Sequence, residues 1–199
     1  MSPYLIFGLA MLGIVIFSLI VTGNLAATFN ERAKRDLRVA LEPLANQLGG
    51  AVNLDDARID GRSQGQITSA QVISGPGGMG RLFETIYIEP AGGSEWKAVV
   101  RRPKADTGEW DRTFDGPSDV SSAMQAPIFE LLDSLLPFPG WFELTYKPDA
   151  GAITLTRAMQ SRRDVPVPER FALYLDVLSQ VATLNRSAQR DGARAGTRS

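Results

Sequence analysis

The chain has 199 residues, of which 44% are hydrophobic and 22% are charged, and its formal net charge is −1. These values match globular proteins, so they exclude a wholly disordered chain and a strong overall attraction to nucleic acid. The absence of cysteine and histidine excludes disulfides, thiolate nucleophiles, cysteine-bound zinc and the usual histidine-based catalytic sites.

An uncharged apolar segment, residues 4–21, lies near the start of the chain. As a helix it spans about 27 Å, close to the hydrocarbon thickness of a membrane, and it has no polar face. We therefore expect a transmembrane anchor over residues 1–29. A cleaved signal peptide is the alternative, but the apolar run is longer than such peptides need and no basic residue precedes it. The predicted anchor residues are Tyr4, Leu5, Ile6, Phe7, Leu9, Leu12, Ile14, Val15, Ile16, Phe17, Leu19, Ile20 and Val21.

Basic residues follow this segment and do not precede it. The positive-inside rule then predicts a single-pass protein of the bacterial inner membrane, with its N-terminus outside and its C-terminal domain in the cytoplasm. The same residues are candidate contacts to anionic lipid headgroups. They are Arg32, Lys34, Arg35 and Arg38.

Residues 30–50 are predicted as an amphipathic neck helix, because apolar residues recur at steps of four and three from Leu25 to Leu48. Pro43 is expected to kink this helix, and Gly49 with Gly50 to end it. The apolar stripe has three candidate neighbours, namely the chain's own domain, a partner or second copy, and lipid headgroups. We expect the leucines after Pro43 to pack on the chain's own domain. The candidate partner interface consists of Leu25, Phe29, Leu37 and Leu41.

Residues 51–185 are predicted to form one α+β domain. Alternating apolar residues indicate strands at 66–74, 82–89, 95–102, 110–114, 141–146 and 152–156. A helical period indicates one helix from about Asp119 to Leu136, stopped by the prolines at 137 and 139, and another from Pro168 to Asn185. We expect an antiparallel sheet of hairpins with both helices packed on one face. Residues 186–199 are predicted to be a disordered, arginine-rich tail.

The order of these elements, with the strand WDRTF at 110–114 and the helix end VATLN at 181–185, resembles uncharacterised bacterial membrane-anchored domains. The resemblance covers roughly residues 109–185 and is one of pattern. It implies the same α+β architecture, and it implies no activity and no functional residue, because that family has no assigned function.

Two motifs in the sequence have the residue types that a chemical site could use. Residues 75–80 have the spacing G-x-G-x-x-G, but a dinucleotide site needs a helix after this motif, and a strand is predicted there. We therefore expect a flexible hairpin loop. Asp111 and Asp115 are the nearest approach to a hydrolase-like carboxylate pair, and we expect both to be solvated.

Basic residues gather in two groups that, with tryptophans as anchors, suggest a surface for an acidic partner or lipid headgroups. The alternative is an ordinary solvated face with tryptophans in the core. The residues are Arg101, Arg102 and Lys104, then Arg157, Arg162 and Arg163, and the tryptophans are Trp96, Trp110 and Trp141.

The function predicted from this organisation is a non-catalytic accessory, assembly or stabilising subunit of a larger integral-membrane complex, for example respiratory or photosynthetic. Its partners are then the lipid bilayer and other integral-membrane subunits, with a homo-oligomer left open. No cofactor, metal or nucleic acid is expected. The alternative is a membrane-tethered sensor or scaffold domain that binds a soluble partner or ligand. An enzyme that uses carboxylates alone is the third class.

Overall fold

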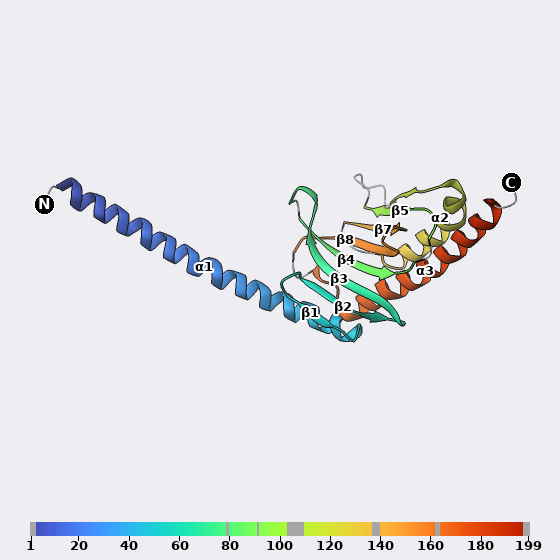
Figure 1. The fold of residues 1–199 in the computed structure, drawn as a ribbon, viewed down its shortest axis with the longest axis horizontal. Coiled ribbons are helices and arrows are strands. Elements are labelled where there is room, and N and C mark those ends of the chain that lie inside the picture. The colour runs from blue at the N-terminus through green and yellow to red at the C-terminus, as the bar shows by residue number, and fades with distance from the viewer. Residues whose placement is uncertain are drawn as a thin grey trace. The chain divides into compact units, whose positions relative to one another are not determined.

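The computed structural model describes residues 3–78, 80–90, 92–102, 110–136, 140–161 and 164–196 (Figure 1). Of these, residues 3–10, 26, 27, 30, 78 and 191–196 are described by their backbone alone. Residues 103–109, the prolines at 137 and 139, and the last three residues of the predicted tail lie outside the described residues. The chain divides into two compact units, residues 1–39 and residues 40–199.

The first unit is formed by helix α1 (Pro3–Gln47), which continues into the second unit. The prediction of a transmembrane anchor over residues 1–29 is corrected here. Within the part of the chain that the structure describes, no helix is both long enough and apolar enough to cross a membrane. Crossing a hydrocarbon core demands that combination in one uninterrupted helical stretch.

In the described part of the second unit, eight strands form an antiparallel sheet in the order β1-β2-β3-β4-β8-β7-β5-β6. The β7–β8 hairpin lies between β4 and β5, so strands distant in sequence form the centre of the sheet. The α+β class and the antiparallel sheet are confirmed, whereas β1 and β2 were not predicted. The strands are β1 (Ala51–Asn53), β2 (Arg58–Ser63), β3 (Gln66–Ser74), β4 (Arg81–Ile88), β5 (Trp96–Arg101), β6 (Asp111–Asp115), β7 (Trp141–Lys147) and β8 (Ala152–Met159).

Helices α2 (Ser118–Asp133) and α3 (Pro168–Gly196) pack against each other and against one face of the sheet (Figure 1). Strand β7 shows the alternation typical of a half-covered sheet, because the buried Phe142, Leu144 and Tyr146 alternate with less buried residues such as Glu143 and Thr145. The rings of Phe83 and Phe171 meet edge to face at 6.2 Å between ring centres, and those of Phe142 and Tyr174 do so at 5.8 Å. These ring pairs fix how α3 lies across β4 and β7.

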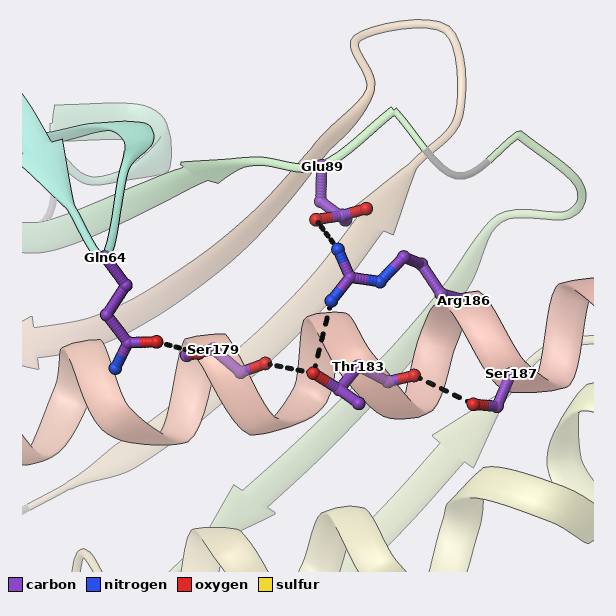
Figure 2. A network of polar contacts seen from close by, with 6 residues as sticks. All are labelled: Gln64, Glu89, Ser179, Thr183, Arg186 and Ser187. Atoms are coloured by element: carbon purple, nitrogen blue, oxygen red, sulfur yellow. Dashed lines mark hydrogen bonds and ion pairs between the residues drawn. The ribbon is translucent and has the colours of Figure 1, made fainter.

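Helix α3 extends beyond Asn185, so the prediction of a disordered tail is corrected for residues 186–196. Figure 2 shows polar contacts of the helix around the point where the prediction ended it. The Arg186 guanidinium donates to the Glu89 carboxylate at 3.0 Å and to the Thr183 hydroxyl at 3.3 Å. One turn earlier in the network, the Ser179 hydroxyl donates to the Gln64 side-chain oxygen at 2.6 Å. The polar side of α3 is thus tied to the β2–β3 turn and to the end of β4.

The end of α1 belongs to the second unit and is part of its core. Leu41 and Leu44 are fully buried, and Leu48 is 2% exposed. The helix ends against β2, where the Arg62 amide donates to the Leu48 carbonyl at 2.8 Å. The close approach depends on Gly50, because a Cβ there would lie 1.8 Å from the Asp60 carbonyl oxygen.

The substitution Gly50→Ala is therefore expected to lower the free energy of unfolding by about 3 kcal/mol, since the backbone of β2 has to move to admit the methyl group. Gly49→Ala is the matched control. Gly49 has a φ of +60°, and a Cβ added to it would meet no atom within 4 Å, so its cost is conformational alone, about 1 kcal/mol. Urea unfolding of both variants measures the difference, and equal losses would contradict the steric explanation.

Candidate functional site

The glycine motif at residues 75–80 joins two antiparallel strands. A 3-10 turn, η1 (Pro76–Gly78), connects β3 to β4, and the two strands pair from Thr68 opposite Tyr87 to Ser74 opposite Arg81. No helix opens after the motif, so it has no row of helix amides to hold a pyrophosphate. Met79 lies outside the described residues. The motif therefore forms the loop of the β3–β4 hairpin, and the prediction of a hairpin loop is confirmed.

The carboxylates Asp111 and Asp115 occupy the two ends of β6 and are both exposed. Four residue steps along the strand place their backbones roughly 13 Å apart, beyond the spacing of a glycosidase carboxylate pair. Each lies opposite a basic residue of β5, Arg101 and Lys97 respectively. Among the described residues, no group of three or more acidic side chains is arranged to hold a metal ion.

The apolar residues of α1 between Met11 and Phe29 form the most conspicuous surface of the first unit. Ile14, Val15, Ile16 and Phe17 are 49% to 69% exposed. Consecutive helix residues point about 100° apart, so these four side chains cover every side of the helix. A helix that is apolar on every side is normally buried. Here the described residues of the chain do not cover these four side chains.

The predicted partner-interface residues divide into two pairs. Leu25 and Phe29 are 52% and 65% exposed, whereas Leu37 is 7% exposed and Leu41 is fully buried. The Leu41 side chain lies in the core of residues 40–199, so it has no surface to offer a partner. The predicted headgroup contacts are all exposed on α1, and whether they meet anionic lipid stays a prediction. They are Arg32, Lys34, Arg35 and Arg38.

The two basic groups lie in different environments in the fold. Arg101 and Arg102 are exposed at the end of β5, whereas Arg157 lies on the helix-covered side of β8. Lys104, Arg162 and Arg163 lie outside the described residues. Trp96 is 1% exposed and belongs to the core, while Trp110 and Trp141 are half-buried.

Among the cavities that the described residues of the second unit form, three are considered as candidate sites by their lining. The first, of about 500 Å³, lies between α2 and α3 and is lined by Pro127, Leu131 and Leu184 among others. The second, of about 480 Å³, lies beside α2 and includes the Arg112–Asp133 ion pair at 2.8 Å. The third, of about 340 Å³, lies between the end of β8 and the start of α3, and two arginines line it. Sequence reasoning missed this third cavity, although most of its lining residues lie between Arg157 and Arg170, because a local sequence does not show that its segment encloses a hollow.

Comparison with known proteins gives no family for this arrangement: no family model, no curated protein and no solved structure matches the chain.

Proposed function

We propose that this chain is a non-catalytic accessory or assembly subunit that joins a larger protein complex through the apolar part of α1, residues 11–29. The observation that supports the proposal is the exposure of apolar side chains on every side of this helix. Burying each large aliphatic or aromatic side chain stabilises an assembly by about 1.5 to 3 kcal/mol. An uncovered helix of this kind therefore has a strong tendency to associate.

The occupant we propose is a set of apolar helices from other subunits. A single groove covers only one side of a helix, and residues 14–17 leave no side that is polar. Covering them all takes several elements at once, which a multi-subunit assembly provides and a small soluble partner does not. The lack of histidine and cysteine in the whole sequence supports a non-catalytic role.

The test uses Phe17→Asp in the full chain, expressed at its native level. Phe17 is 69% exposed, and an unpaired carboxylate in an apolar interface is costly. We expect the native chain to elute in a complex with stoichiometric partners, and the variant to elute free, near the 21.6 kDa of one chain. The melting temperature of residues 40–199 is expected to stay unchanged, because Phe17 lies in the other unit.

Arg35→Asp is the control on the same helix, because Arg35 is exposed outside the apolar part. This variant is expected to remain in the complex. The proposal is overturned if Phe17→Asp also remains there. It is overturned equally if the purified native chain binds protein-free phosphatidylcholine vesicles and elutes without protein partners, because the apolar surface would then be covered by lipid.

A further inference from the structure

We propose that the third cavity binds a small organic carboxylate, with Arg157 as the residue that pairs with its carboxyl group. The cavity is lined by residues of the second unit alone and shares none with the apolar part of α1, so this inference is independent of the proposed function. Its volume of about 340 Å³ is at the lower end for ligand sites. A monocarboxylic acid with a short aliphatic chain fits both this volume and the residues that line the cavity.

Arg157 occupies an unusual position for a charged residue. It lies on the core side of β8, in register between Phe83 of β4 and Phe142 of β7. Its guanidinium carbon lies 5.9 Å from the centre of the Tyr174 ring. Its Nε is inaccessible to solvent and has no hydrogen-bond partner within the described part of the chain. A buried donor without an acceptor is costly, so Nε has an unmet hydrogen-bonding requirement beside the cavity that Arg157 lines.

The charges around the cavity favour one negative charge on the ligand. Two arginines, Arg157 and Arg170, line it together with one acid, Asp164. The Asp164 carboxylate accepts from the backbone amides of Gln160 and Ser161, at 2.8 and 2.7 Å. Arg170 donates to the Leu135 carbonyl. Both residues are therefore held by the chain itself, and Arg157 remains as the donor for an incoming anion.

A carboxylate suits this donor better than a phosphate does. The planar guanidinium fork matches a carboxylate, whereas a doubly charged phosphate would meet the Asp164 carboxylate in the same cavity. The remaining walls are largely apolar, with Ala158 at the sheet end and Val165 and Val167 before α3. These walls provide contacts for an aliphatic chain and none for a second charge.

The probe is hexanoate, with hexan-1-ol and inorganic phosphate as comparisons, each titrated calorimetrically into the full chain. We expect hexanoate to bind at one site per chain with a Kd of about 1 mM or tighter, from the usual contribution per ligand atom. Hexan-1-ol and phosphate are expected to bind at least tenfold more weakly. The absence of hexanoate binding up to about 10 mM, or equal binding of either comparison probe, overturns the proposal.

Arg157→Met is expected to weaken hexanoate binding at least tenfold. Its control is Arg101→Met, which changes an exposed strand arginine outside the cavity and should leave the Kd unchanged. Because Arg157→Met alters the core side of the sheet, Val167→Trp is a second variant. Val167 is 61% exposed at the cavity rim, so the larger ring should narrow the entrance without disturbing the core. Native hexanoate affinity in either folded variant contradicts the assignment.

Discussion

A chain that begins at Gly50 is expected to be unfolded at room temperature, although it keeps the whole sheet together with α2 and α3. Removing the preceding residues strips the core of Leu41, Leu44 and Leu48, each of them at most 2% exposed. At about 1.5 to 3 kcal/mol for each leucine, the loss is roughly 5 to 9 kcal/mol. That is comparable with the whole stability of an ordinary domain, about 5 to 15 kcal/mol.

Circular dichroism and urea unfolding of two truncated chains measure this effect. A chain that begins at Ala40, the first residue of the second unit, is the matched control and should melt cooperatively. It also keeps the hydrogen bond from the Gln47 side-chain amide to the Pro168 carbonyl, at 2.8 Å. If the chain that begins at Gly50 melted at the same temperature as the control, the end of α1 would not be part of the core.

Trp96→Ala is expected to cost about 4 to 6 kcal/mol in the free energy of unfolding, as the sum of two losses. The indole is 1% exposed and stacks between Phe114 and Tyr146, at 5.9 and 6.2 Å between ring centres. Its Nε1–H donates to the side-chain oxygen of Asn185 at 2.8 Å, and Asn185 is fully buried. The substitution therefore leaves a large cavity and also removes the indole donor from a buried amide.

Trp141→Ala is the control for the loss of an indole as such. Trp141 begins β7, is half-buried, and lies one residue out of phase with the core-facing Phe142. We expect its removal to cost about 1 kcal/mol, in the range typical of partly exposed sites. Chemical denaturation of both variants gives the comparison. Similar losses from the two tryptophans would mean that the buried Trp96–Asn185 pair contributes little to stability.

Local sequence was sufficient for the elements whose signal is local. The alternation at 141–146 and 152–156 predicted the two strands of the β7–β8 hairpin, and the apolar period between Asp119 and Leu136 predicted α2. The absence of histidine and cysteine removed whole classes of chemistry before any fold was known. Strand β2 was not predicted because its sequence, RIDGRS at residues 58–63, has only one buried apolar residue, Ile59. It is a strand because its backbone pairs with β1 and β3.

The tertiary structure decided what depends on residues far apart in the sequence. The apolar stripe from Leu25 to Leu48 is continuous in the sequence, yet Phe29 is exposed and Leu41 is buried. Burial differs because it depends on which other elements of the fold pack against each turn of the helix. Likewise, Arg157 looks like part of a surface cluster until its register between Phe83 and Phe142 places it on the core side of the sheet. Sequence periodicity specifies which residues share a face, and only the packing of distant elements determines what that face meets.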